Sequence, residues 1–212
     1  MTQRIGLSTL LVLIYSLASP AGNAASLPEK IIPVPIVTQA TPYSCGAAAV
    51  LSTLYYWQAY DGNESSLYGP LETTPKDGTV PEKMAEVARA HGVKAEIREH
   101  QSLNDLRAAL AAGDTVIVEY QAWRDVKAPK LPWKDTWEEG HYSVLVGLDG
   151  INLFFMDPSA HKGYGYIPEA EFLDRWHDYD VYQGAPVRHF QLGIFIHGKK
   201  PLGKFPGLLR IE

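Results

Sequence analysis

A single cysteine, Cys45, is the sequence feature that most restricts how this chain can fold. Because one thiol cannot form an intramolecular disulfide, the stability of the fold has to come from a hydrophobic core. Hydrophobic residues make up 46% of the chain and charged residues 20%, which are ordinary values for a globular protein. The length of 212 residues fits one domain with a sizeable core. We therefore expect one globular domain without structural disulfides.

The first 24 residues have the pattern of a secretory signal peptide. Arg4 provides a positive charge, residues 5–18 are mostly apolar, and small residues follow as far as Ala25. This apolar run is shorter than the roughly 20 residues that span a bilayer. We expect cleavage after Ala24, so that residues 25–212 form an exported domain in the periplasm or the medium. An N-terminal anchor helix, or a buried helix of the fold, is the alternative.

Charge and hydropathy exclude several classes of partner. The formal net charge of -5 argues against nucleic acid and against an anionic membrane surface. No segment after the N-terminal run is apolar for long enough to cross a membrane. We expect the mature chain to be a monomer with no membrane span.

The residues after Cys45 predict a buried helix that begins at or near this cysteine. An alanine-rich apolar run extends to Trp57, and Pro42 indicates a turn just before it. The dipole and the free N–H groups of a helix N-terminus stabilise a thiolate. Gly46 would leave room for a substrate, and the side chain of Gln39 could join the Cys45 N–H as an oxyanion hole. A buried, inert cysteine is the alternative, which the cysteine count alone slightly favours.

A nucleophilic thiol also needs a base, and among the seven histidines His141 is the exceptional one. It leads into a predicted buried strand, 142–148, whereas the others have ordinary explanations at helix ends, in polar or loop-like segments, or in the basic C-terminal part. A second apolar strand, 151–156, ends at Asp157, and the two strands predict an antiparallel hairpin. A regular two-residue turn would put His141 and Asp157 on opposite faces, so their pairing requires a three-residue loop or a bulge. Taken alone, His141 is better explained as a hydrogen-bonded histidine at a strand end.

Three short blocks together resemble the C39-like peptidases, which are papain-like cysteine peptidases related to bacteriocin-processing domains. The blocks are QATPYSCGAAA at 39–49, GHYSVLVG at 140–147 and MDP at 156–158. The similarity continues through residues 163–176, so it covers most of the mature chain. Each block alone is weak evidence, but their order and spacing are fairly specific.

The resemblance implies a function for the candidate residues. Cys45 would be the nucleophile, His141 the general base, Asp157 its orienting partner and Gln39 part of the oxyanion hole. The implied reaction is hydrolysis of a peptide or protein substrate through a Cys45 thioester. A thiol amidase or a transpeptidase-like acyl transferase, and a non-catalytic peptide-binding module, are alternatives. We expect no cofactor and no metal, because no third ligand lies at a recognisable spacing from His141 and Asp157.

The remaining segments predict an α+β fold, in which the Cys45 helix packs against an antiparallel sheet as in papain-like peptidases. Pro81 predicts the start of a helix at 81–91, and Ser102 with Asp105 resembles a capping box that opens a helix at 102–112, which Gly113 ends. A short helix is predicted after Pro168, with Phe172 and Trp176 on one face, towards the core. Apolar runs predict the strands 93–98, 115–120 and 187–196.

Residues 121–140 have no regular pattern and lead directly to His141. Long loops in small domains are often functional. We therefore expect this loop to form one wall of a substrate cleft, with Trp123, Trp133, Trp137 and Gly140 as substrate-binding residues. A packed surface loop whose tryptophans fill the edge of the core is an equally good explanation.

Overall fold

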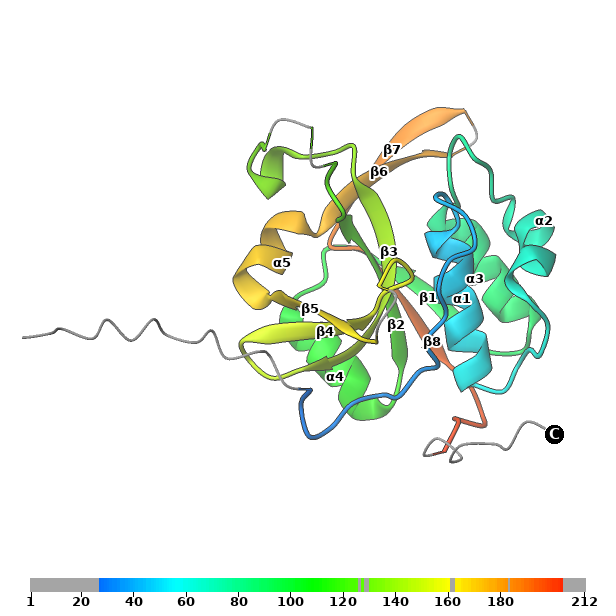
Figure 1. Ribbon diagram of the computed structural model, residues 1–212. Helices are drawn as coiled ribbons and strands as arrows, with labels where there is room; N and C mark the ends of the chain where they lie inside the picture. The colour runs from blue at the N-terminus through cyan, green and yellow to red at the C-terminus, as the bar shows by residue number, and fades with distance from the viewer. Residues whose placement is uncertain (1–26, 126, 128–129, 161–162, 183, 204–212) are drawn as a thin grey trace, which may run out of the picture.

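A six-stranded antiparallel sheet forms the centre of the protein, in the strand order β1-β8-β2-β3-β4-β5 (Figure 1). The computed structural model describes residues 27–125, 127, 130–160, 163–182 and 184–203. The predicted signal peptide and its cleavage site lie outside these residues. The strands of the sheet are β1 (Lys94–Arg98), β2 (Thr115–Gln121), β3 (Gly140–Leu148), β4 (Asn152–Met156), β5 (Gly165–Pro168) and β8 (Gly193–His197).

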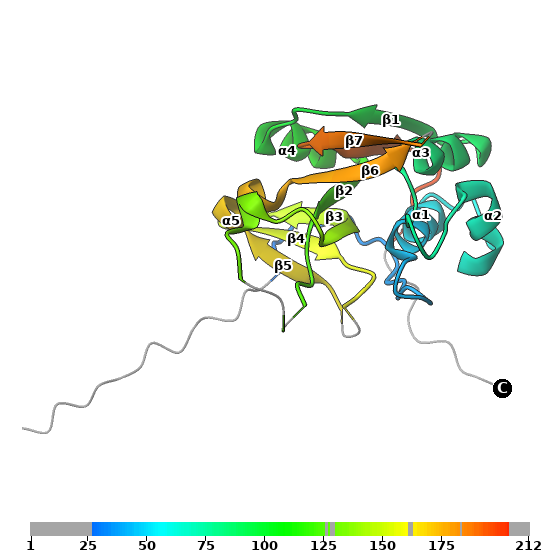
Figure 2. The ribbon, with the colours of Figure 1, turned by 90° about the horizontal axis from the view of Figure 1, so that it is seen from above.

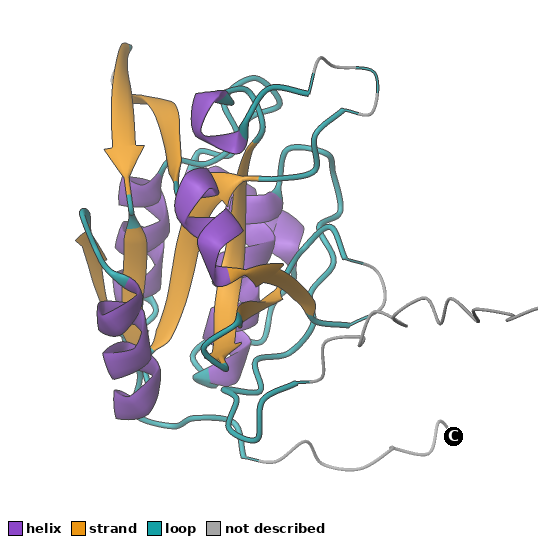
Figure 3. Ribbon diagram, turned by 90° about the vertical axis from the view of Figure 1, so that its left-hand side faces the viewer, coloured by secondary structure: helices purple, strands orange, loops and turns teal. Residues whose placement is uncertain are grey.

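Helices cover both faces of this sheet (Figures 2 and 3). One face carries α1 (Cys45–Tyr56) and α3 (Pro81–Ala90), with the short α2 (Tyr68–Leu71) packed beside them, and the other face carries α4 (Leu103–Ala112) and α5 (Glu169–Arg175). A hydrophobic cluster fills each of the two interfaces. Two single-turn helices, η1 (Glu64–Leu67) and η2 (Trp133–Asp135), complete the helical elements of the described chain. The predicted α+β fold, with the Cys45 helix packed on an antiparallel sheet, is confirmed.

Helix α1 is buried along almost its whole length, as its alanine-rich sequence predicts. It packs against β3 and β2 of the sheet and against α3. A Cβ atom added at Gly46 would lie 3.0 Å from the Cβ of Thr79 and 3.3 Å from the sulfur of Met84. The glycine at this position is therefore explained by close packing against the start of α3. The expectation that Gly46 leaves room for a substrate has no support in this geometry.

The hairpin of β3 and β4 contains the bulge on which the pairing of His141 with Asp157 depends. Leu145 pairs with Phe155, but Gly147 pairs with Phe154, so Val146 is one residue too many on its strand. Because side chains alternate between the two faces of a strand, this extra residue reverses the relative orientation that a regular two-residue hairpin would give His141 and Asp157. His141 and Asp157 therefore project from the same face.

The predicted final strand 187–196 is wrong, because it consists of two strands that belong to different sheets. The first is β7 (Ala185–Phe190), which pairs with β6 (His177–Tyr182) in a separate hairpin. The second, β8, joins the central sheet. Between them Gln191 has a φ of +48° and its N–H donates to the carbonyl of Trp176, so the chain turns out of one sheet and into the other. Hydrophobic alternation continues across such a break and cannot reveal it.

Several local signals are confirmed. Ser102 and Asp105 form the predicted capping box at the start of α4, and Gly113 ends this helix with a φ of +86°. Phe172 in the middle of α5 and Trp176 directly after it are fully buried in the core. Strands β5 and β6 were not predicted, because their sequences are short and mixed in polarity. Within the described residues no helix is both long and apolar enough to cross a membrane.

Candidate active site

Cys45 is the first residue of α1, at the edge of a cleft of about 360 Å³. Ser44 precedes it and caps the helix, since the carbonyl of Ser44 accepts a hydrogen bond from the backbone N–H of Ala48. The N–H groups of the first helical residues have no acceptor within the helix and are available to a ligand. The thiol is partly buried and is not in a disulfide. The helix N-terminus can stabilise a thiolate at this position, and the cleft gives a substrate access to it.

His141, on β3, is buried and is the candidate base for Cys45. Its Nε2 lies 3.0 Å from Oδ1 of Asp157, which leaves Nδ1 as the ring nitrogen available to Cys45. Burial lowers the pKa of His141, but the Asp157 carboxylate and the neighbouring Cys45 side chain outweigh it and raise the pKa from 6.5 to about 10. The Cys45 side chain therefore lies close enough to the imidazole to interact with it by hydrogen bonding and by charge. Catalytic contacts of this kind often tighten only when a substrate is bound.

Asp157 is held in place by several donors besides His141. The N–H of Ser159 donates to Oδ1 at 2.7 Å, the hydroxyl of Tyr120 to Oδ2 at 3.2 Å, and the indole N–H of Trp123 to Oδ2 at 3.1 Å. Burial raises the pKa of the Asp157 carboxyl, but its hydrogen bond and charge interaction with His141, together with these donors, bring it below the ordinary value. The carboxylate therefore stays ionised and fixes the orientation of the imidazole ring.

Gln39 connects the segment before Cys45 to the segment after Asp157. Its backbone N–H donates to the carbonyl of Pro158 at 3.0 Å, and its Oε1 accepts from the hydroxyl of Ser159 at 2.9 Å. Its Nε2 donates one hydrogen to the carbonyl of Thr41 at 2.7 Å. The second amide hydrogen remains for another acceptor. The position is compatible with an oxyanion hole, and the role of Gln39 stays a prediction.

The four predicted substrate-binding residues do not share one surface. Trp137 and Gly140 line the cleft that contains Cys45. Trp123 and Trp133 line a different hollow, of about 410 Å³, together with Asp157. The exposed ring of Trp123 reaches Asp157 with its N–H, so it also supports the orienting carboxylate.

The packing of the other tryptophans of this loop explains their positions. Trp133 is stacked between the guanidinium groups of Arg124 and Arg175, at 3.8 and 3.7 Å from the ring centroid. Trp137 packs against the rings of His177 and Phe190. These contacts favour a packed loop for Trp133. A substrate contact for Trp137 is compatible with its place in the cleft and stays a prediction.

Sequence analysis missed a group of ionisable side chains beside the cleft. Glu119, Asp178, Asp180 and His189 are all buried or nearly so, although His189 was expected in polar or loop-like surroundings. Burial and the charge of Asp180 raise the pKa of Asp178 to about 7, although its hydrogen bonds with the protein oppose this. The one signal that could have revealed this group is Glu119, a charged residue in the otherwise uncharged run TVIVEYQ.

Comparisons with solved structures agree with this fold. The putative C39-like peptidase from Bacillus anthracis superposes with a TM-score of 0.58 at 17% identity, covering 82% of this chain and 100% of that one. The peptidase domain of Streptococcus ComA, a bi-functional ABC transporter involved in quorum sensing, gives a TM-score of 0.55 at 18% identity, covering 80% and 98%. A double-glycine-motif protease from an AMS/PCAT transporter, solved with the leader peptide, gives 0.51 at 19% identity, covering 79% and 94%.

No curated protein sequence matches this chain significantly. The sequence model of the Peptidase_C39 like family, in contrast, matches residues 31–183, which is well over half of the chain and includes Gln39, Cys45, His141 and Asp157. This match, with the shared fold, identifies the resemblance of the three short blocks as family membership. The chain belongs to the Peptidase C39-like family and contains a cysteine peptidase domain of that family.

Proposed function

We propose that this protein is an exported peptidase that hydrolyses peptide bonds through a thioester on Cys45. The observation that carries the proposal is the placement of Cys45 at the N-terminus of α1, beside a buried His141 that is paired with Asp157. A nucleophile, a base and an orienting carboxylate in this order form the usual arrangement for acyl transfer by a thiol.

In the first half of the reaction, His141 holds the proton of the Cys45 thiol while the sulfur attacks the carbonyl carbon of the substrate. The Cys45 N–H and the second amide hydrogen of Gln39 donate to the oxygen, which becomes negatively charged. His141 then gives its proton to the leaving amine as the C–N bond breaks. The acyl group remains on sulfur as a thioester.

In the second half, water replaces the amine product. His141 accepts a proton from the water as its oxygen attacks the thioester carbonyl, and the same donors stabilise the second oxyanion. The C–S bond breaks, His141 returns the proton to Cys45, and the carboxylic acid product leaves. Asp157 stays ionised throughout and stabilises the imidazolium form of His141.

A peptide substrate is supported by the structure of the related double-glycine-motif protease, which was solved with the leader peptide. The cleft of about 360 Å³ next to Cys45, lined by Pro42 and Gly140 among others, offers a place for such a substrate. Export is supported by the charged, apolar and small-residue order of the first 24 residues.

The test is a digest of a peptide library by the wild-type chain and by Cys45→Ala, purified in the same way. We expect cleavage by the wild type and none by the variant, and cleavage that survives the substitution would disprove the proposal. Repeating the digest with an added amine separates hydrolysis from acyl transfer, because a transferase would yield the amide in place of the acid.

Export is tested separately, by sequencing the N-terminus of protein recovered from the periplasm or the medium. We expect the mature chain to begin at Ala25. Protein that retains residues 1–24 and remains with the cell membrane would instead support the anchor helix.

A further inference from the structure

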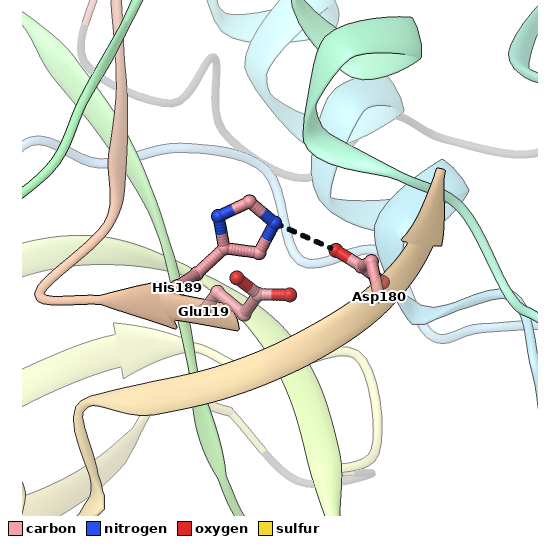
Figure 4. Close-up of side chains that lie close together, drawn as sticks. All are labelled: Glu119, Asp180 and His189. Carbon is pink, nitrogen blue, oxygen red and sulfur yellow. Dashed lines mark ion pairs between the residues drawn. The ribbon is translucent and has the colours of Figure 1, made fainter. Parts of the chain in front are cut away.

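A second group of ionisable side chains converges where β2, β6 and β7 meet (Figure 4). Glu119 comes from β2, Asp180 from β6 and His189 from β7. One ligand atom from each lies within 4.8 Å of the other two. The exposed fractions of Glu119 and His189 are only 1% and 3%, so these groups face one another inside the protein.

Two atoms that point into this cluster lack a hydrogen-bond partner. Oε2 of Glu119 and Nε2 of His189 are buried and make no hydrogen bond with the described residues. The nearest carboxylate oxygen to Nε2 is Oδ2 of Asp180 at 3.5 Å, beyond the roughly 3.2 Å limit of a good N–H···O bond. Leaving buried polar atoms unpaired is costly, so their common orientation indicates a ligand that contacts both.

Other side chains bind the atoms of His189 and Glu119 that face away from the cluster. Nδ1 of His189 lies 2.6 Å from Oε1 of Glu99, an anionic acceptor that fixes the ring proton on Nδ1. Nε2 is then left with its lone pair directed at the cluster. A carboxylate that holds the outer nitrogen of an inward-facing histidine is the usual support of a metal-bound imidazole.

Tyr142 holds the Glu119 carboxylate in a similar way. Its hydroxyl donates to Oε1 of Glu119 at 2.6 Å, so that Oε2 is the oxygen that remains free on the side of the cluster. The hydroxyl also lies 3.3 Å from Oδ2 of Asp180. The single hydroxyl hydrogen is shared unequally, with the shorter contact to Glu119, and the negative charges of the two carboxylates repel each other across a short distance.

We propose that Glu119, Asp180 and His189 bind one divalent cation of the first transition series, such as Zn²⁺ or Mn²⁺. Two carboxylates and a neutral imidazole carry a charge that a divalent cation balances. The mixed oxygen and nitrogen ligands favour these ions over Ca²⁺ and Mg²⁺, which prefer oxygen ligands alone. The proposal differs from the absence of a metal predicted from the sequence, because these three residues form no spacing motif.

The cation would join the hairpin of β6 and β7 to the central sheet, since its ligands come from both. Asp180 also lines the cleft that contains Cys45, so the ion would remove negative charge from one wall of that cleft. Binding at this site does not involve Cys45 or His141. The proposal therefore stands or falls independently of the peptidase reaction.

The test is a titration of the untagged, chelator-treated chain with Zn²⁺, using the Cys45→Ala protein so that the catalytic thiol cannot bind the metal. We expect a single tight site per chain and a higher melting temperature with Zn²⁺. Glu119→Gln and His189→Gln should weaken binding by more than about 100-fold, and Glu99→Gln by about 10- to 100-fold.

The matched control is His197→Gln. His197 is also paired with a carboxylate, at 2.7 Å from Asp114, but it lies exposed at the end of β8 and is not a member of the cluster. This variant should bind Zn²⁺ like the parent. Mn²⁺ serves as a second probe, because its electron paramagnetic resonance signal reports binding directly.

Two results would overturn the proposal. One is a parent chain that binds neither Zn²⁺ nor Mn²⁺ and melts at the same temperature with and without them, which would mean that protons alone neutralise the cluster. The other is binding that Glu119→Gln and His189→Gln leave unchanged. If either variant does not fold, Glu99→Gln decides, because the Glu99 side chain is partly exposed and its amide substitute is the same size.

Discussion

Nε2 of His141 lies 3.0 Å from Oδ1 of Asp157, and this contact exists because the strand between them carries one extra residue, Val146. The bulge places both side chains on one face of the hairpin. Burial then makes the contact mutually reinforcing, since neither a buried imidazolium nor a buried carboxylate is stable without its partner. The pair is therefore both a catalytic candidate and a structural element.

Asp157→Asn tests the charge of the orienting residue separately from its shape. The amide keeps a hydrogen bond to His141 but removes the negative charge that raises the pKa of His141. We expect the alkaline limit of kcat/KM to move to lower pH, with a smaller fall in rate than Asp157→Ala, which should lose about 10²-fold or more.

Asp149→Asn is the matched control for this pair. Asp149 is the other carboxylate of the same hairpin, but its oxygen accepts the N–H groups of Ile151 and Asn152 at the far end. The pH profile of this variant should equal that of the wild type. An unchanged profile in Asp157→Asn as well would show that Asp157 does not act on His141 in solution.

The stability of the protein should depend on pH through the same two groups. The folded pKa of His141 is raised, so its stabilising contribution is complete below about pH 6.5 and is lost as the pH rises towards about 10. The contribution of Asp157, whose pKa is lowered, is present at neutral pH and is lost as the pH falls through its folded value. Unfolding by urea should show the wild type losing roughly 2–5 kcal/mol between pH 6 and 10 relative to His141→Gln. Parallel curves for the two proteins would contradict the pairing.

Gln39→Ala tests the predicted oxyanion donor. A donor that acts only in the transition state lowers kcat with little change in KM, and a loss of about 10²- to 10³-fold is expected. Ser159→Ala is the control, since it removes the hydroxyl bound to Gln39 but keeps the backbone N–H that donates to Asp157. Its loss of kcat should be much smaller. Equal losses in both variants would mean that Gln39 acts only by holding the loop.

Gly140→Ala tests how closely the cleft wall is packed. A Cβ atom at this position would lie 2.0 Å from Oδ2 of Asp178, so either the strand or the carboxylate has to move. We expect a loss of about 1–3 kcal/mol in the free energy of unfolding, which the second substitution Asp178→Ala should partly restore.

Gly69→Ala is the control for this substitution, because an added Cβ meets nothing within 4 Å there. It should be neutral or slightly stabilising, as alanine favours a helix over glycine. A double variant of Gly140→Ala and Asp178→Ala that is no more stable than Gly140→Ala would place the strain elsewhere.

Local chemistry alone was sufficient to predict much of this protein from its sequence. The start of α1 at Cys45, the capping box of Ser102 with Asp105 and the helix end at Gly113 each depend on residues within a few positions of one another. Strands β2, β3 and β4 followed from apolar runs that only a buried sheet can accommodate. These features allowed a candidate nucleophile and a candidate base to be named.

Only the tertiary structure shows how the candidate catalytic residues come together. The sequence could state that the pairing of His141 with Asp157 needed a bulge or a three-residue loop, but only the packing of the hairpin placed the bulge at Val146. The contact of Trp123 with Asp157 and the separation of β7 from β8 likewise follow from long-range packing.

The cluster of Glu119, Asp180 and His189 is the clearest case of what the sequence could not reveal. Its members lie on three strands that meet only after β6 and β7 have turned away from the central sheet. Spacing along a chain predicts contacts within a helix, a strand or a tight turn, where backbone geometry fixes the distance. Contacts between separate elements depend on how the whole core packs, and no local pattern records them.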